Sequence, residues 1–218
     1  MITETLRALE DVAALSDSIV VAYSDGKDSR VVMDLCVRTF KRVEAFFMYL
    51  VPSLECIEAG LEEARQRWGV QIRQYPHWIV RRFIEYSVFC DPKLGRDDMP
   101  EYKLHDIYAL AMADTGSRLL ATGAKKSDSA WRRRFMSVKY ADQITPIADW
   151  NKYDVLSYLK VRGIPVPVSN NKKSATGIDL TPESLIWLHD TFPRDFARVC
   201  ECFPYAESVI WQRHFYAA

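Results

Sequence analysis

The feature that most constrains the fold is a short apolar run that stops abruptly at a polar loop. Residues 19–30 read IVVAYSDGKDSR, so that four apolar residues precede a loop rich in hydroxyl, carboxyl and amino groups, and a helical pattern follows. Such a run is typical of a buried strand in a parallel sheet, with the loop at the carboxyl end of the strand and a crossover helix behind it. The chain is therefore expected to fold as an α/β protein.

The rest of the chain repeats this alternation of short apolar runs and longer amphipathic stretches. The pattern predicts strands at residues 18–23, 43–51, 70–75, 118–122 and 143–147. It predicts helices at 3–15, 30–40, 54–68 and 103–114, one that opens at Asn151 and ends at Gly163, and three more after residue 181. We expect residues 1–165 to form one α/β domain, and residues 166–218 to extend it as a loop and a helical tail packed on the sheet. Two polar segments, 90–102 and 165–180, are expected to be long loops able to cover a site.

Composition narrows the class of protein and of partner. Lys and Arg together number 29, as do Asp and Glu, so no net charge draws the whole molecule to nucleic acid or to a membrane surface. The longest apolar stretch, 45–51, is far shorter than the ~20 residues that span a bilayer. The five cysteines lack a C-x-x-C pair and the four histidines lack H-x-x-x-H spacing. We therefore expect a soluble cytoplasmic protein with no iron-sulfur cluster, no zinc and no membrane partner, which binds any polyanion locally.

The loop at residues 24–29 has the groups that an anion site requires. Gly26 allows close backbone approach or a positive φ, and the unpaired amides of the first helical turn can donate to a phosphate. The hydroxyls of Ser24 and Ser29 and the ammonium group of Lys27 add donors, while Asp28 would hold a magnesium ion or orient the loop. An ordinary surface turn is the alternative, because Ser, Asp and Gly are common turn residues.

Three motifs in order carry a resemblance to a known family. The loop resembles the S-G-G-x-D-S PP-loop of the adenine nucleotide alpha hydrolase superfamily. The stretches TGAKKSDSAWR at 122–132 and PIADWNKYDV at 146–155 resemble the signatures of one branch, the phosphoadenosine phosphosulfate (PAPS) reductase family. The resemblance covers about residues 18–165. It implies a Rossmann-like, HUP-type fold, with helices on both faces of a five-stranded parallel sheet, and an adenine nucleotide as the ligand, either ATP or PAPS.

The resemblance also implies site residues. Those expected to bind the nucleotide are Ala22, Tyr23, Ser24, Asp25, Gly26, Lys27, Asp28, Ser29, Met48, Tyr49, Gly123, Lys125 and Arg132. Lys27, Asp28, Lys125 and Arg132 are the expected catalytic residues, and Asp28 is the expected ligand of a magnesium ion that accompanies ATP. Independently of the resemblance, residues 125–139 hold six basic side chains against one acidic side chain, which suits a phosphate or sulfate group. A solvated basic face is the alternative. Asp149 and Trp150 are expected to fix the start of the next helix or to contact the ligand.

The chain departs from the family pattern at two points. Asp25 replaces the first glycine of the loop, and it is a metal ligand, a helix cap or the sign of a changed ligand. The E-C-G-x-H sequence that carries the thiol of PAPS reductases is missing, and no cysteine follows Cys202. A sulfonucleotide reductase would need a thiol elsewhere, at Cys90 or Cys202.

Three functions follow. The first is an ATP pyrophosphatase that adenylates an unidentified acceptor, with sulfur metabolism or nucleic-acid modification as settings that the resemblance implies, so a nucleic acid stays among the acceptors. The second is a PAPS reductase, and the third is a nucleotide-binding subunit without chemistry. The aromatic residues of the C-terminal tail leave room for self-association or a protein partner. We expect Asp28→Ala or Ser29→Ala to weaken nucleotide binding at least tenfold, about 1.4 kcal/mol.

Overall fold

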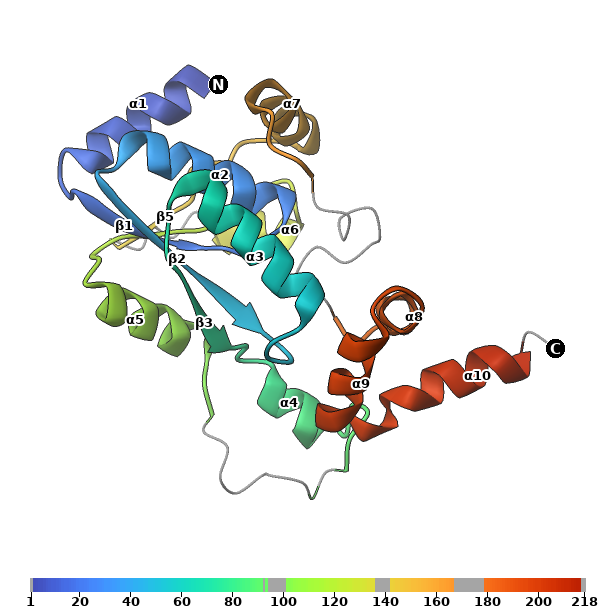
Figure 1. Cartoon of the computed structure of the whole chain (residues 1–218). Helices are drawn as coiled ribbons and strands as arrows, with labels where there is room; N and C mark the ends of the chain where they lie inside the picture. The colour runs from blue at the N-terminus through green and yellow to red at the C-terminus, as the bar shows by residue number, and fades with distance from the viewer. Residues whose placement is uncertain (1, 92, 94–100, 136–141, 167–178, 217–218) are drawn as a thin grey trace.

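The computed structural model describes residues 2–91, 93, 101–135, 142–166 and 179–216. Its centre is a sheet of five parallel strands in the order β3-β2-β1-β4-β5, shown in Figure 1. The strands are β1 (Ser18–Ala22), β2 (Arg42–Tyr49), β3 (Ile72–Pro76), β4 (Leu120–Ala121) and β5 (Gln143–Ile144). The α/β class and the five parallel strands are confirmed.

Helices connect these strands and extend the chain beyond them. The body contains α1 (Ile2–Ala13), α2 (Lys27–Thr39), α3 (Glu55–Trp68), α4 (Val80–Glu85), α5 (Leu104–Thr115), α6 (Ala130–Phe135) and α7 (Lys152–Arg162). The C-terminal region contains α8 (Pro182–Thr191), α9 (Pro193–Cys202), the 3-10 helix η2 (Pro204–Glu207) and α10 (Ser208–Tyr216). The short helices α4 and α6 were not predicted. The two long loops predicted at 90–102 and 165–180 fall largely outside the described residues.

The alternation of side chains along β1 divides the core into two layers. Ile19 and Val21 face a cluster built with α1, α2, α3 and α7, whereas Val20 faces a second cluster built with α5. All three side chains are fully buried, and each is worth roughly 1.5–3 kcal/mol of hydrophobic stabilisation. Helices thus cover both faces of the sheet, as the sequence predicts.

The start of α7 follows the expected capping pattern. The side chain of Asn151 accepts from the backbone N–H groups of Tyr153 and Asp154, and a carboxylate oxygen of Asp154 accepts from the N–H of Asn151 at 2.8 Å. At the other end, Gly163 adopts the left-handed conformation, with φ at 61°, that favours glycine after a helix. The predicted boundaries of this helix are confirmed.

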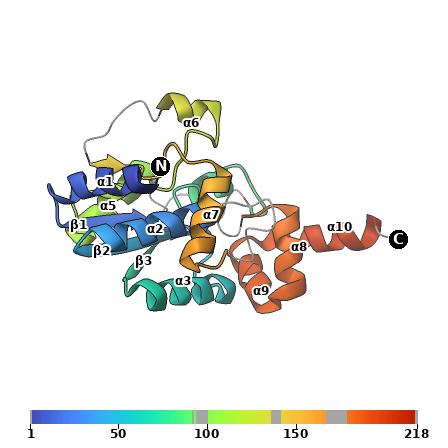
Figure 2. The same ribbon diagram turned by 90° about the horizontal axis from the view of Figure 1, so that it is seen from above.

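The C-terminal helices do not pack on the sheet, which corrects the prediction. They build their own apolar cluster with Val51, Leu54 and Cys90, and that cluster contains no residue of the five strands. Asp195 in α9 attaches it to the body: this carboxylate, 1% exposed, accepts from the backbone N–H groups of Glu55 at 2.7 Å and Cys56 at 2.9 Å. It therefore caps the start of α3, which has no cap of its own. Figures 1 and 2 show α10 projecting away from the rest of the molecule.

None of the helices in the described part of the chain combines the length and the apolar character that crossing a membrane requires.

Candidate functional site

The loop after β1 leads directly into α2. Asp25 has a positive φ of 56°, whereas Gly26, the N-cap of α2, has a φ of −83°. The left-handed turn that glycine would favour therefore lies at Asp25, not at Gly26. No side chain caps the first turn of α2, so its backbone N–H groups point toward the loop without a side-chain acceptor.

The hydroxyl groups of the loop brace the turn. Ser29, which is buried, donates to the carbonyl oxygen of Gly26 at 2.9 Å, and Ser24 donates to the hydroxyl oxygen of Ser29 at 3.3 Å. The two serines thus hold the two ends of the loop together. The expected phosphate loop is a closed, hydrogen-bonded turn at the carboxyl end of a central strand, where open α/β sheets bind their ligands.

The segment after β4 lies against this loop. The two strands are neighbours, with Val20 opposite Leu120 and Val21 opposite Ala121. A Cβ atom at Gly123 would lie 3.3 Å from both the backbone carbon of Asp28 and the backbone nitrogen of Ser29. Glycine at 123 therefore permits the close approach of the two segments, and a larger residue would push them apart.

A chain of alternating charges joins the two segments. Lys27 and Lys125 each place an ammonium nitrogen 2.7 Å from a different carboxylate oxygen of Asp28. Lys125, 3% exposed, also lies 3.0 Å from Asp128, whose other oxygen lies 2.8 Å from Arg132. Burial acts to raise the pKa of Asp128, but its hydrogen bonds and charge interactions with Lys125 and Arg132 outweigh this effect and lower the pKa. Three cations and two carboxylates leave the cluster with a net positive charge suited to an anion.

A magnesium ion bound directly to Asp28 does not fit this arrangement. Both carboxylate oxygens of Asp28 are already 2.7 Å from ammonium groups, so a metal would have to displace a lysine. In the described part of the chain, no three His, Cys, Asp or Glu side chains gather closely enough to hold a metal ion. Asp28 instead orients Lys27 and Lys125.

Some of the other residues predicted to bind the nucleotide lie at the same edge of the sheet as the loop. Ala22 ends β1, and Met48 and Tyr49 end β2, so these three residues lie at the same carboxyl edge as the loop. Tyr23 is buried, and its hydroxyl donates to Asp25 at 2.8 Å. Arg132 and Arg133 are exposed, and Lys139 lies outside the described residues.

Asp25 is neither the cap of α2 nor a side chain directed at a metal site, the two structural roles that the sequence suggested. Gly26 is the N-cap, and the carboxylate of Asp25 is turned into an ion pair with Arg30 at 2.7 Å. Burial raises the pKa of Asp25, and the neighbouring Arg30 opposes this shift without cancelling it. The sequence pattern does not single out Arg30, which it places at the start of the predicted helix 30–40.

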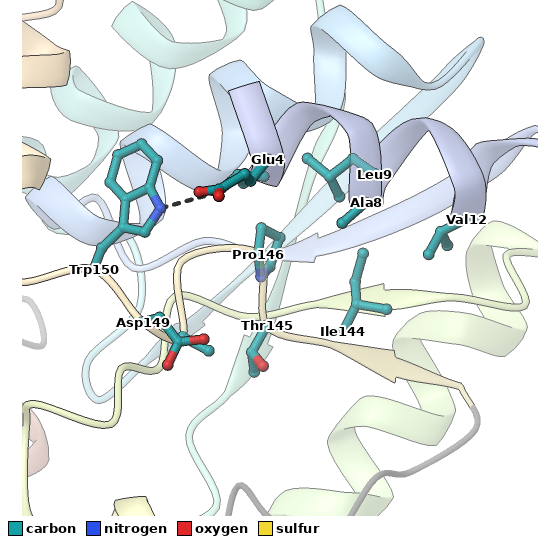
Figure 3. Close-up of a pocket in the computed structure, with 11 residues that line it drawn as sticks. Glu4, Ala8, Leu9, Val12, Ile144, Thr145, Pro146, Asp149 and Trp150 are labelled. Carbon is teal, nitrogen blue, oxygen red and sulfur yellow. Dashed lines mark hydrogen bonds between the residues drawn. The ribbon is translucent and has the colours of Figure 1, made fainter. Parts of the chain in front are cut away.

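A pocket of about 380 Å³ lies apart from the loop, between α1 and the segment around β5 (Figure 3). Glu4, Ala8 and Leu9 line it from α1, facing Ile144 and Pro146, and no residue of the 24–29 loop is among its lining residues.

Asp149 and Trp150 close one end of this pocket. The indole N–H of Trp150 donates to the hydroxyl of Thr5 at 3.0 Å, and the ring is buried. Asp149 lies 2.5 Å from Lys126. The structure thus gives both residues packing and bridging contacts within the protein.

The cysteines are poorly suited to nucleophilic chemistry. All five are free thiols. Burial raises the pKa of every one, including Cys90 and Cys202, the two candidates for a reductase. Cys90 lies in the C-terminal cluster, and its thiol donates to the carbonyl oxygen of Phe83. A raised pKa reduces the thiolate fraction at neutral pH, and the thiolate is the reactive form.

Comparison with known proteins identifies relatives of the chain. Residues 18–168 match the family described as the phosphoadenosine phosphosulfate reductase domain. No curated protein matches the chain. Among solved structures, the chain is similar to an NH3-dependent NAD synthetase from Campylobacter jejuni subsp. jejuni NCTC 11168 in complex with the nitrate ion. The TM-score is 0.50 and the sequence identity 14%, over 99% of this chain and 94% of that chain. The Rossmann-like, HUP-type fold expected from the sequence is confirmed.

Proposed function

The chain belongs to the phosphoadenosine phosphosulfate reductase domain family, and from this membership we propose that it binds an adenine nucleotide, ATP or PAPS, with the charged tail of the nucleotide in the loop at residues 24–29. The adenine would lie near the ends of β1 and β2, beside Ala22, Tyr23, Met48 and Tyr49. The acceptor would belong to sulfur metabolism or nucleic-acid modification, and the protein would act in the cytoplasm, as its composition predicts.

One observation carries this proposal: the ion pair between Lys125 and Asp28. It joins the phosphate loop to the segment after the neighbouring strand, with Gly123 packed against the loop backbone. Backbone N–H groups from one segment and cations from the other are thereby held at one edge of the sheet. A hydrogen bond to a charged group contributes about 1.5–3 kcal/mol, so each such contact would strengthen nucleotide binding.

We propose adenylation as the reaction. An oxygen of the acceptor attacks the α-phosphorus of ATP, the bond to the bridging oxygen of the β-phosphate breaks, and pyrophosphate leaves with the electron pair of that bond. Lys27, Lys125 and Arg132, which are held by their ion pairs with Asp28 and Asp128, would offset the charge that builds up on the leaving pyrophosphate. No step depends on a metal ion held by the protein.

A second candidate is a nucleotide-binding subunit without chemistry. The ion pairs of Lys27 and Lys125 with Asp28 favour it, because lysines whose charge is offset by a carboxylate are less available to stabilise a leaving pyrophosphate. The reductase alternative is less well supported, since the pKa of each of the five thiols is raised.

Calorimetry with ATP, AMP, APS and PAPS, each with and without magnesium, tests the proposal, followed by a pyrophosphate-release assay with the tightest ligand. ATP binding with pyrophosphate release supports adenylation, and nucleotide binding without turnover supports the subunit. Preference for PAPS together with release of sulfite supports the reductase. Failure of all four nucleotides to bind overturns the proposed function.

A further inference from the structure

The phosphate loop contains a carboxylate that ought to oppose a nucleotide. Asp25 lies next to Gly26, the N-cap of α2, and it adopts a left-handed backbone conformation at φ 56°. Asp is among the non-glycine residues that tolerate this conformation, so the backbone can keep its turn with Asp in place of glycine. An unpaired negative charge at this position would still repel a phosphate tail.

Arg30 removes that charge from the loop. Its Nη2 lies 2.7 Å and its Nε 3.1 Å from Oδ1 of Asp25, and its side chain is only 4% exposed. The hydroxyl of Tyr23 donates to the same oxygen at 2.8 Å. Three donors therefore converge on one carboxylate oxygen and direct it into the protein.

The other contacts of Arg30 fix its position. Its Nη1 lies 2.6 Å from Glu63 in α3 and 3.2 Å from the carbonyl oxygen of Pro165, which follows α7. The loop is thereby attached to two further elements of the fold. On the far side of the carboxylate, a Cβ atom at Gly60 would collide with Oδ2 of Asp25, so glycine at 60 provides the space that the buried carboxylate needs.

We propose that Arg30 is a positioning residue for the nucleotide site: by pairing with Asp25, it holds the left-handed turn in place and neutralises the charge of the Asp25 carboxylate. The inference rests on the proposed function, because it assumes that the loop receives a nucleotide tail. It adds a role for a residue outside the loop motif, and it explains how the loop can carry Asp where the family has glycine.

Nucleotide affinity in a charge-matched set of variants tests the inference. Arg30→Gln keeps hydrogen-bond donors but leaves Asp25 unneutralised, so we expect binding of ATP or PAPS, whichever the wild type prefers, to weaken at least tenfold. The double variant Asp25→Asn with Arg30→Gln removes both charges, and its affinity should return to within threefold of the wild type.

Arg162→Gln is the matched control. Arg162 also pairs with a buried carboxylate, that of Asp34 at 3.0 Å, but it bonds to neither Asp25 nor Arg30, so we expect a change of less than threefold. Urea unfolding of each variant separates lost binding from lost folding. If Arg30→Gln does not fold, Arg30→Met and its partner double variant, Asp25→Gly with Arg30→Met, replace the first pair.

The outcomes distinguish this inference from the proposed function. A wild-type protein that binds no nucleotide overturns the proposed function, whatever the variants do. If the wild type binds and Arg30→Gln binds equally well, or the double variant is no better than the single one, only the inference about Arg30 is overturned.

Discussion

The ammonium nitrogen of Lys125 lies 2.7 Å from Oδ1 of Asp28, which joins the loop after β1 to the segment after β4. These segments are far apart in the sequence but follow adjacent parallel strands, so the sheet brings them together. Because Lys125 is buried and Asp28 also holds Lys27, the pair serves two purposes. It fastens the loop, and it concentrates positive charge where a phosphate group would bind.

Replacing Lys125 should impair both nucleotide binding and stability. In Lys125→Met, we expect affinity for the preferred nucleotide to fall at least tenfold by calorimetry, and the free energy of unfolding to fall by about 2 kcal/mol, because Asp28 and Asp128 lose a shared buried partner. Lys126→Met is the matched control, since Lys126 pairs with Asp149 and not with the loop. Equal effects of the two substitutions would contradict the assignment of Lys125.

The hydroxyl of Ser29 should matter for binding because it closes the loop. Ser29→Ala removes the hydrogen bond to the carbonyl oxygen of Gly26 and leaves Ser24 without its acceptor. We expect at least a tenfold loss of nucleotide affinity, about 1.4 kcal/mol, in the same calorimetric assay. Ser127→Ala, which removes only a bond to the carbonyl oxygen of Trp150, should change affinity by less than threefold. Unchanged affinity in Ser29→Ala would remove the loop from the site.

Asp28→Ala should weaken nucleotide binding as much as Ser29→Ala does, but for a different reason. Asp28 holds Lys27 and Lys125 in place, so its loss would release both cations. We expect at least a tenfold weaker binding in Asp28→Ala and a smaller loss in Asp28→Asn, which retains an acceptor oxygen. Tighter binding in Asp28→Ala would show that the carboxylate competes with the nucleotide for the lysines.

Asp195 should stabilise the whole protein by capping α3. Asp195→Ala leaves the backbone N–H groups of Glu55 and Cys56 without their acceptor, and we expect the free energy of unfolding to fall by about 1–2 kcal/mol in urea titrations. The control is Asp190→Ala, which breaks exposed pairs with Arg213 and His189 and should cost less than Asp195→Ala does. A smaller effect at Asp195 than at Asp190 would refute the capping role.

Tyr158 should make stability depend on pH in the alkaline range. Burial, and next the hydrogen bond to Asp34, raise its pKa from 10.0 to about 12. The folded state therefore holds the phenolic proton more tightly than the unfolded chain does, so this stabilisation is complete below pH 10 and is lost as pH rises to 12.

The matched measurement compares wild type with Tyr158→Phe in urea at pH 8 and pH 11. At pH 8 the variant should be less stable by about 1 kcal/mol, because Asp34 loses a donor. By pH 11 the gap should narrow by about 1 kcal/mol, as the wild type loses its advantage. Tyr153→Phe, at an exposed tyrosine of the same helix, is the control. A gap for Tyr158→Phe that stays constant with pH would contradict the expectation.

The sequence was sufficient to predict the strands but not their full geometry. The apolar runs located all five, yet β4 and β5 extend over only two residues each, because an apolar run does not reveal how far a neighbouring strand continues to pair. The C-terminal helices were predicted, but their partner was not. Helical periodicity identifies an apolar face such as that of Phe196 and Val199 without indicating what that face will cover.

For the candidate site, the sequence predicted where the segments lie but not how their side chains pair. The loop and the segment after β4 could be placed at one edge of the sheet from strand order and family motifs. The pairing of Asp25 with Arg30 could not, since it depends on Glu63 and Gly60 in another helix. The sequence also did not predict that Asp28 pairs with both Lys27 and Lys125. A local pattern does not show that two lysines from different segments will reach the same carboxylate.

The space that Gly60 leaves for Asp25 restricts how this protein can have evolved. An ancestor with glycine at position 25 could have carried alanine at 60, but the buried carboxylate became admissible only where 60 was already glycine, and harmless only where 30 was already basic. Once Asp25 is in place, neither Gly60 nor Arg30 can be replaced alone, because the first provides the space for the carboxylate and the second its counter-charge. Resurrected intermediates should therefore be viable where Asp25 was acquired last and defective where it came earlier.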